Sequence, residues 1–461
     1  MDYREEKDTL GTVQVPVDAY YGAQTRRAVE NFPISGIVLP PPFIRALALI
    51  KRCAAEVNLE LGLLEPELGR AIVKAAGEVV EGRFDKQFVV DVYQTGSGTS
   101  TNMNMNEVVA TRANELLTGE KSTRRPVHPN DHVNQGQSSN DVIPTTLHVA
   151  ALSEIRQSLI PGLRMLQSVL LKKAADFSDV HKIGRTHLQD AVPMTLGQEF
   201  SGFARQIELA VDRLKACETR LAELALGGTA VGTGLNATPG FAAGVIDRLR
   251  RNTGLPFSEA VNHFEAQAGR DAAVEVSGAL KTLAVSLVKI ANDIRWLASG
   301  PRCGLGEINI PSLQPGSSIM PGKVNPVIPE AVLQVAAQVI GNDTAITYGG
   351  QAGNFELNVM IPVIAHNLMQ SIHLLASAVD VFTEKCIKGI TANRERCAAN
   401  IEQSLAMVTG LVPEIGYEKA ADIAKKAFES GKTVREVARQ ENILPAEVLN
   451  RILNVGGDHE Q

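Results

Sequence analysis

The sequence predicts a mainly α-helical, soluble protein whose central part is a bundle of long helices. Apolar residues recur at alternating spacings of four and three in three segments, 196–224, 276–297 and 361–382, and this pattern indicates helices packed near-parallel. Aromatic residues make up only 4% of the chain, so the core must depend on aliphatic side chains, which suit packed helices better than a β-sandwich. A chain of 461 residues is too long for one compact core, so more than one domain is expected.

Changes in composition along the chain predict three domains. Residues 1–139 alternate short apolar segments with Gly, Pro and Asn, which is typical of a mixed, mostly helical N-terminal domain. Residues 140–393 hold the long helices of a central bundle domain, and a helix over 196–224 would be ~43 Å long at ~1.5 Å per residue. Residues 394–461 are expected to form a small C-terminal helical domain. The shorter helices are expected at about 43–62 and 66–81 in the first domain and at about 398–409, 417–429, 433–439 and 445–454 in the third.

The long helices carry apolar residues on two faces. Leu209, Val285 and Val288 lie opposite the residues of the four-three pattern, and a helix that is apolar on two sides is buried from both sides. We therefore expect the central helices to pack within the subunit and also against other copies of the chain. A large helical core in a monomer is the alternative.

Composition excludes several classes of partner. The net charge of -6 comes without long charge runs, so no nucleic-acid or membrane-surface partner is expected. The five cysteines are scattered and lack a CxxC pair, which excludes a disulfide framework and favours a reducing cytoplasm. The N-terminus, MDYREEKDTLG, has no apolar stretch and is not a signal peptide. No run approaches the ~18 apolar residues that a membrane span needs.

Four segments interrupt the helical pattern with Gly, Ser, Thr and Asn, which supply hydrogen-bond donors and unusual backbone angles. Residues 94–106, QTGSGTSTNMNMN, indicate either a donor-rich cradle for an anion at a helix start or a capped helix N-terminus. Residues 125–145 include HPNDHVN and GQSSND. Ser138, Ser139 and Asn140 stand where a long helix begins, and its dipole would favour a carboxylate there, although capping is the commoner use of such residues.

The other two segments contain a histidine and a lysine. Residues 184–198, GRTHLQDAVPMTLGQ, place His187 just before a long helix, although a lone histidine is more often structural than catalytic. Residues 314–326, QPGSSIMPGKVNP, contain two Gly, three Pro, adjacent serines and one Lys, which excludes regular structure. A buried irregular loop would leave backbone groups unpaired, so we expect a mobile surface loop that carries function.

Two patterns resemble known sites but lack their spacing. The string GGTAVGTG at 227–234 has no GxxxxGK[ST] pattern and follows a long helix instead of a strand, so a nucleotide site is not expected. His128 and His132 are four residues apart, but Pro129 lies between them and the chain has no HExxH, so a zinc site is not expected either.

The remaining residues suit carbanion chemistry. Many neutral donors can hold two anionic groups, which fits a dicarboxylate. Removal of a proton beside a carboxylate creates a doubly charged aci-carboxylate that preorganised donors and a cation must stabilise, and a closing loop would exclude water. The sequence therefore predicts a cofactor-free enzyme that adds a small molecule to, or eliminates it from, a carbon beside a carboxylate.

Together, these segments resemble the fumarase/aspartase superfamily. The string GSSIMPGKVNP at 316–326 is similar to its signature loop, and the resemblance runs through nearly the whole chain. It implies a three-domain subunit, a homotetramer with a twenty-helix core, and active sites that each draw residues from three subunits. The strings QTGSGTSTNMNMNE, HPND, QSSND, GRTHLQDA, WLASGPRCG and GNFELNV resemble class II fumarase most, since aspartases tend to have GGAGTS, QSTND and GQLxLNV. DAYYGAQT, HVN and NPVIPE are more similar to aspartases.

The resemblance implies reversible hydration of fumarate to L-malate, a step of the tricarboxylic acid cycle, with no cofactor and no metal. Aspartate ammonia-lyase is the alternative, and a crystallin-like structural protein of the same fold is less favoured because His187, Ser317, Lys323 and Glu330 are all present.

The resemblance also implies roles for individual residues. Ser317 would remove the C3 proton of malate, and because free serine is a poor base, backbone N–H groups and Lys323 would have to stabilise its alkoxide. His187 would activate water or protonate the leaving hydroxyl, with Glu330 as its carboxylate partner. Substrate binding is implied for Ser97, Gly98, Thr99, Ser138, Ser139, Asn140, Thr186, Ser318, Lys323, Val324 and Asn325, and a second dicarboxylate site for Arg125, His128, Pro129, Asn130 and Asp131.

Overall fold

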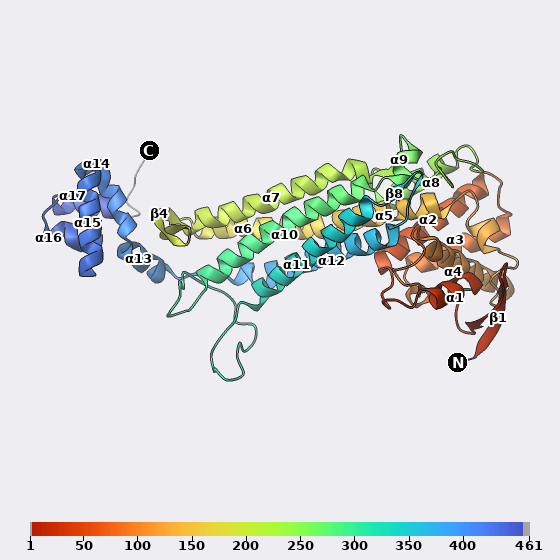
Figure 1. Ribbon diagram of the computed structural model, residues 1–461, viewed down its shortest axis with the longest axis horizontal. Helices are drawn as coiled ribbons and strands as arrows, with labels where there is room; N and C mark the ends of the chain where they lie inside the picture. The colour runs from red at the N-terminus through yellow and green to blue at the C-terminus, as the bar shows by residue number, and fades with distance from the viewer. Residues whose placement is uncertain (1, 455–461) are drawn as a thin grey trace. The chain divides into compact units, whose positions relative to one another are not determined.

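The computed structural model describes residues 2–454, which are mainly helical (Figure 1). The helical fold class expected from the sequence is confirmed. The chain forms two compact units, each assembled from three stretches of sequence. Unit 1 consists of Met1–Pro161, Asp212–Ala284 and Ala337–Ala376, and unit 2 of Gly162–Val211, Val285–Ala336 and Ser377–Gln461.

The N-terminal part of unit 1 begins with a β-hairpin that the sequence analysis did not predict. Strands β1 (Tyr3–Asp8) and β2 (Gly11–Pro16) pair antiparallel. Helix α1 (Ala23–Asn31) follows, and then α2 (Pro41–Glu60) and α3 (Pro66–Val80) appear within two residues of the predicted bounds. Both of these helices begin with proline, whose fixed φ suits the first helical turn.

The rest of unit 1 holds the helices that begin at the two serine-rich segments. Helix α4 (Thr99–Thr118) follows Gly98, and α5 (Ser139–Glu154) follows Ser138. Short helical turns lie at Asp85–Gln87, Pro129–Val133 and Ile155–Leu159, and two further helices are α8 (Phe241–Thr253) and α9 (His263–Ala268).

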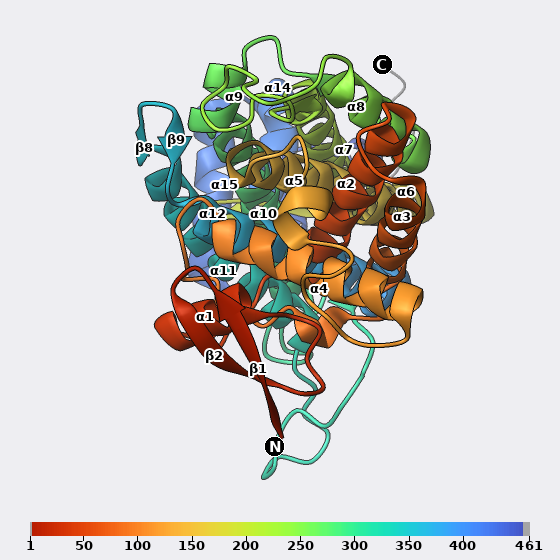
Figure 2. The ribbon, with the colours of Figure 1, turned by 90° about the vertical axis from the view of Figure 1, so that its right-hand side faces the viewer.

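Five long helices lie side by side in Figures 1 and 2, and three of them carry the four-three pattern found in the sequence. The apolar residues of this pattern in the segments 196–224, 276–297 and 361–382 are at most 4% exposed, so the predicted packing is confirmed. The helix predicted over 196–224 ends at Leu221, and Leu224 is buried in a short strand instead. The helices are α6 (Ile160–Asp176), α7 (Leu196–Leu221), α10 (Asp271–Leu297), α11 (Val327–Gly350) and α12 (Ile361–Lys385).

Polar contacts also join the long helices. In unit 1, Ser277 of α10 donates to Asp343 of α11 at 2.8 Å, and Asn342 of α11 donates to Ser371 of α12 at 3.0 Å. In unit 2, the Lys289 ammonium of α10 lies 4.4 Å from the ring centre of Phe203 in α7. The two hydrogen bonds are buried, whereas Lys289 is exposed and reaches over the buried Phe203 ring, and together these contacts show which helices are neighbours.

The C-terminal part of unit 2 consists of short helices around a small core. The helix predicted at 398–409 is misplaced, because the Asn393 side chain accepts from a backbone N–H and starts α13 at Arg394, while Ser404 starts a separate turn. The other three helices are close to their predicted bounds. The elements are α13 (Arg394–Gln403), a 3₁₀ turn (Leu405–Leu411), α14 (Val412–Ile415), α15 (Tyr417–Ser430), α16 (Val434–Gln440) and α17 (Ala446–Leu453).

Short strands pair between the helices. The longest pair is the antiparallel hairpin of β3 (His181–Thr186) and β4 (Gln189–Thr195) in unit 2. The remaining elements are β5 (Glu223–Leu224) with β6 (Ser258–Glu259), β7 (Ile308–Asn309) with β10 (Thr391–Ala392), β8 (Gly353–Asn354) with β9 (Leu357–Asn358), and a 3₁₀ turn at Ile387–Gly389. Among residues 2–454, no helix has the length and apolar character to cross a membrane.

Candidate active site

In unit 1, a chain of three hydroxyl groups joins the first two serine-rich segments. The hydroxyls of Ser97 and Thr99 are 2.7 Å apart, and the Thr99 hydroxyl is also 2.7 Å from that of Ser139. Gly98 separates the first two residues with φ +74°, and a Cβ atom at this position would lie 2.8 Å from Ile143. The left-handed backbone and the close neighbour both require glycine here. Because Thr99 begins α4 and Ser139 begins α5, the hydroxyl contact between them shows that the two helix N-termini lie side by side.

The N-terminus of α5 is held by a buried carboxylate. Asp141 accepts the Ser138 backbone N–H at 2.9 Å and completes a capping box with the Ser138 side chain. The other Asp141 oxygen accepts from the backbone N–H groups of Gly227 and Thr229 at 3.1 and 3.0 Å. The glycine-rich string GGTAVGTG thus binds an anion, but that anion is the protein's own aspartate, which explains the resemblance to a phosphate loop.

The Asn140 side chain is oriented by the same glycine-rich loop. Its amide nitrogen donates to the Ala230 carbonyl at 2.8 Å. This bond turns the amide so that its oxygen remains free to accept a hydrogen bond. The serines and the asparagine that the sequence singled out are therefore close together, and Ser138 serves as the cap that the alternative interpretation expected.

A fully buried lysine lies beneath this helix start. The Lys51 ammonium donates at 2.9 Å to the side-chain oxygens of both Asn134 and Gln137, immediately before Ser138. Burial lowers the pKa of Lys51 to about 7, against the opposing effect of the Asp141 charge. Burial also raises the pKa of Asp141 to about 6, although its backbone hydrogen bonds and Lys51 favour the carboxylate.

The second predicted anion site forms one turn. The His128 ring nitrogen Nδ1 accepts from the backbone N–H groups of Asn130 and Asp131 at 3.3 and 3.2 Å. His132 Nδ1 in turn accepts the His128 backbone N–H at 2.9 Å. Local hydrogen bonds therefore occupy both histidines. Arg125 and Asn130 are exposed, and the role of this turn as an anion site stays a prediction.

In unit 2, His187 occupies the turn of the β3–β4 hairpin. The turn has two central residues, His187 and Leu188, with φ of +56° and +61°. Such a turn normally contains Asn and Gly, because both central residues must have positive φ. Two non-glycine residues in this region cost about 1–3 kcal/mol each. Backbone strain is therefore concentrated at the predicted catalytic histidine, and the His187 side chain is exposed to solvent.

The segment between α10 and α11 forms an open loop with a folded centre (Figure 1). The Ser317 hydroxyl oxygen accepts the backbone N–H groups of Ile319 and Met320 at 3.2 and 3.1 Å. The Gly316 N–H donates to the Lys323 carbonyl at 2.8 Å, and a Cβ atom at Gly316 would lie only 2.5 Å from that oxygen. A side chain at Gly316 would thus open the loop and displace Ser317.

A cavity of ≈ 830 Å³ in unit 2 brings the loop and the hairpin together. Lys323, Val324, Asn325 and Glu330 line it, and so does Leu188, the neighbour of His187 in the turn. Glu330 lies in the first turn of α11. This cavity collects four of the eight site residues predicted in unit 2 around one space large enough for a small dicarboxylate, whereas Thr186, His187, Ser317 and Ser318 do not line it.

Comparison with known proteins decides the family. Residues 11–341 match the family model described as Lyase, and residues 407–456 match the one described as Fumarase C C-terminus. A class II fumarate hydratase of Nitrosomonas europaea is 57% identical over 445 residues, which are 96% of each chain. The chain belongs to the class II fumarate hydratase family. It is also 55% identical to the mitochondrial fumarate hydratase of Rattus norvegicus, over 96% of this chain and 88% of the rat protein.

Solved structures of similar proteins have the same fold. The class II fumarase of Schistosoma mansoni superposes with a TM-score of 0.95 at 42% identity, over the full length of both chains. A fumarate lyase:delta crystallin of Brucella melitensis, bound to cobalt, superposes with a TM-score of 0.93 at 47% identity, over 98% of each chain. The membership in the fumarase/aspartase superfamily that the sequence predicted is therefore confirmed, and the protein is a lyase.

Some of the contacts predicted for the catalytic residues are present in the structure, and others are not. The backbone N–H groups expected at Ser317 are present. Among the described residues, no hydrogen bond joins Lys323 to the Ser317 hydroxyl, and no ion pair joins His187 to Glu330. Thr186 and Ser318 are exposed at the hairpin end and in the loop. The roles assigned to these residues stay predictions.

Sequence reasoning missed the buried groups that support the predicted site. Lys51 and Asp141 fix the N-terminus of α5, while Arg185 and Glu307 form an ion pair below the His187 turn. A lysine within an apolar helical pattern was the available signal for Lys51. Glu307 gave none, because nothing in its local sequence shows that it lies beside residue 185.

Proposed function

We propose that this chain catalyses the reversible addition of water to fumarate to give L-malate. The observation that carries the proposal is the environment of the Ser317 hydroxyl, which receives two backbone hydrogen bonds. Ser317 lies in the 311–326 loop, the part of the segment between α10 and α11 that directly precedes α11. Donors aimed at an oxygen stabilise negative charge on it. They favour the alkoxide that a serine must form in order to remove a proton from carbon.

In the proposed reaction, Ser317 takes the C3 proton of malate and leaves an aci-carboxylate. The Lys323 ammonium and the Asn325 amide, which line the cavity of unit 2, would stabilise the two negative charges. The C2–O bond then breaks, and His187 supplies a proton so that water leaves. Glu330 would orient the imidazole and favour its charged form. In the hydration direction the same groups act in reverse order.

The hydroxyl chain and the helix starts of unit 1 suit the substrate carboxylates. Ser97, Thr99 and Ser139 offer neutral donors, and the N-termini of α4 and α5 add the positive ends of two helix dipoles. Neutral donors bind a dianion without leaving an excess of charge in the empty site. Substrate binding at these residues, at Ser138 and at Asn140 is part of the proposal.

We also propose a homotetramer of three-domain subunits, divided at 1–139, 140–393 and 394–461, with sites that combine residues of three copies. Apolar side chains support it: Val285 on α10 is 55% exposed and Ile340 on α11 is 39% exposed in the single chain. Exposed apolar side chains on long helices that already bury one apolar face suit packing against a partner helix. A place in the cytoplasm and in the tricarboxylic acid cycle follows from the proposed reaction and from the reduced, scattered cysteines.

One absorbance experiment tests the reaction. The conjugated double bond of fumarate absorbs in the ultraviolet, so purified protein is mixed with L-malate or with L-aspartate and absorbance is followed without added cofactor. We expect fumarate from malate and no comparable release from aspartate. Faster formation of fumarate from aspartate would replace the proposal by aspartate ammonia-lyase, and no product from either substrate would refute both.

A further inference from the structure

A buried ionic cluster lies directly below the His187 turn. The Glu307 side chain is fully buried, and it accepts two hydrogen bonds from the Arg185 guanidinium at 3.0 and 2.7 Å. The Asn400 amide donates to the same carboxylate at 3.0 Å, and the Lys182 ammonium lies 3.6 Å away. Burial opposes ionisation of Glu307, but Arg185 and Lys182 outweigh it, so the pKa of this carboxyl lies below its ordinary value.

The Glu307 backbone is itself held at both of its polar groups. Its N–H donates to the carbonyl of Leu297 at the end of α10, at 2.8 Å. Its carbonyl accepts the Asn393 N–H just before α13, also at 2.8 Å. These two backbone bonds hold Glu307 between the end of α10 and the start of α13, so the position of its carboxylate is fixed. Within residues 2–454, the side chains that connect this carboxylate to the hairpin are those of Arg185 and Lys182, both on strand β3.

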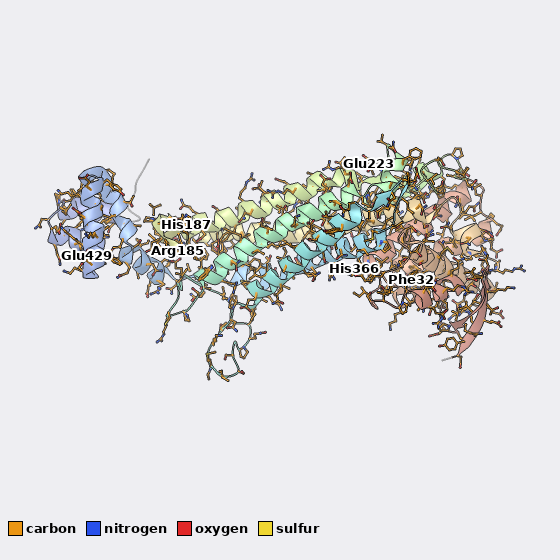
Figure 3. All side chains as sticks on the ribbon, in the orientation of Figure 1. Phe32, Arg185, His187, Glu223, His366 and Glu429 are labelled. Carbon is orange, nitrogen blue, oxygen red and sulfur yellow. The ribbon has the colours of Figure 1, made fainter. Side chains whose placement is uncertain are left out.

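Arg185 is the last paired residue but one before the turn. It pairs with Asp190 across the hairpin, and Thr186 and Gln189 close the turn around His187 and Leu188. Figure 3 shows Arg185 and His187 on the same hairpin. The turn has no glycine to accommodate its two positive φ angles, so its conformation persists only if neighbouring structure holds it. The bidentate pair with Glu307 is the nearest rigid contact.

We propose that Glu307 is a positioning residue for His187, acting through Arg185. The inference rests on the proposed function, in which His187 delivers the proton to the leaving hydroxyl at C2. Glu307 touches no reacting atom in this proposal. Glu307 fixes the position and orientation of the turn that carries His187. This matters because a displacement of a proton donor by about 1 Å can lower the rate by about 10²-fold.

This role predicts a defect in only one half of the reaction. Ser317, which removes the C3 proton, lies on a loop separate from the hairpin. Formation of the carbanion should therefore continue when the hairpin moves. Breaking of the C2–O bond should slow, since it needs the proton from His187. The carbanion then returns to malate more often than it proceeds to fumarate. In D₂O the proton that Ser317 has taken can exchange with solvent while the carbanion persists, and a return after this exchange places deuterium at C3. A longer-lived carbanion therefore raises the ratio of C3 exchange to fumarate formation.

Glu307→Gln and Arg185→Lys test the proposal. The first keeps the shape of the side chain but removes its charge, and the second keeps the charge but removes the bidentate geometry. Asp179→Asn is the matched control, because Asp179 forms a bidentate pair with Arg394 of α13 at 2.9 Å in both bonds. That pair joins the start of the same hairpin to the same helix, but it is exposed.

Each protein is incubated with L-malate in D₂O, and initial rates are measured before fumarate accumulates. Proton NMR gives deuterium at C3 of malate, and absorbance gives fumarate. For Glu307→Gln and Arg185→Lys we expect kcat to fall by about 10²-fold, KM to stay within roughly three-fold, and the exchange ratio to rise by about ten-fold or more. Glu307→Asp should recover part of kcat, and Asp179→Asn should match the wild type.

Equal loss of exchange and elimination in Arg185→Lys, or an unchanged kcat, would refute the inference, because a purely structural role lowers both steps together. If Glu307→Gln does not fold, Arg185→Lys decides the question. Residue 185 is partly exposed, and lysine keeps the positive charge beside the buried carboxylate, so this variant is expected to fold. Wild-type protein that forms no fumarate from malate would instead refute the proposed function. The two failures are therefore distinguishable.

Discussion

Replacement of Lys51 by methionine should change how stability depends on pH. The folded-state pKa of Lys51 is lowered to about 7 by burial, whereas a lysine in the unfolded chain has a pKa of about 10.4. Between these values the unfolded chain binds a proton that the folded chain has released. Stability must therefore rise with pH across this window, by about 1.4 kcal/mol per pH unit at most.

The structure sets the size of this effect. At about pH 7 half of the folded chains still carry the Lys51 proton, so the gain between about pH 7 and about pH 9 is about 2 kcal/mol instead of the full ~2.7 kcal/mol. Asp141, whose pKa is raised to about 6, has largely titrated below this range. Lys51→Met fills the same space without a titrating group, and leaves the oxygens of Asn134 and Gln137 without their donor.

Urea unfolding at the two pH values measures the difference. The free energy of unfolding of the wild type, minus that of Lys51→Met, should increase by about 2 kcal/mol from the lower to the higher pH. Lys172→Met is the control, because Lys172 is exposed and its ion pair with Asp176 lies at the surface. Its pH dependence should parallel that of the wild type. Parallel curves for wild type and Lys51→Met would show that Lys51 keeps its proton in the folded state, and the reasoning would be wrong.

Four further predictions follow from the site and the fold. Ser317→Ala should lower kcat by about 10²–10⁴-fold with a much smaller change in KM, in steady-state assays with malate; a kcat within a few-fold of wild type would remove Ser317 from the mechanism. A saturating dicarboxylate should slow hydrogen exchange in the 311–326 loop, and unchanged exchange would count against a closing loop. Asp141→Ala leaves three backbone N–H groups without an acceptor, so urea unfolding should show a loss of about 3 kcal/mol; a loss below about 0.5 kcal/mol would contradict this. Sedimentation should give a homotetramer, and a stable, active monomer would exclude the oligomer inferred from apolar residues such as Val285.

The helical architecture could be predicted from the sequence because it depends on local periodicity. The apolar residues of the four-three pattern in α7, α10 and α12 recur at a spacing that only a helix can place on one face, and all residues of this pattern are buried. Turn and cap chemistry was harder to predict. Asn393 could cap a helix or sit in a loop, so the start of α13 was misplaced by several residues. The β3–β4 hairpin was missed because its turn, His187–Leu188, lacks the usual Asn-Gly pair.

The candidate site divides in a similar way. Residues within short Gly- and Ser-rich strings could be found, because such strings are unusual between long helices. Residues that support them could not. Glu307 lies 122 positions from Arg185 along the chain, and Asp141 receives the N–H groups of a loop 86 positions away. Contacts of this kind depend on how the helices pack, and periodicity does not specify that.

The row of hydroxyls formed by Ser97, Thr99 and Ser139 has a consequence for a reaction that runs both ways. Each hydroxyl carries one hydrogen and can give it to either neighbour, and both distances in the row are 2.7 Å. Rotation of the three O–H bonds together reverses the direction of donation without moving a heavy atom or a net charge. The outer oxygen can then offer a hydrogen to a carboxylate, or a lone pair to an alcohol. The same three hydroxyl groups can thus bind both an alkene diacid and a hydroxy diacid without a change in the positions of their heavy atoms.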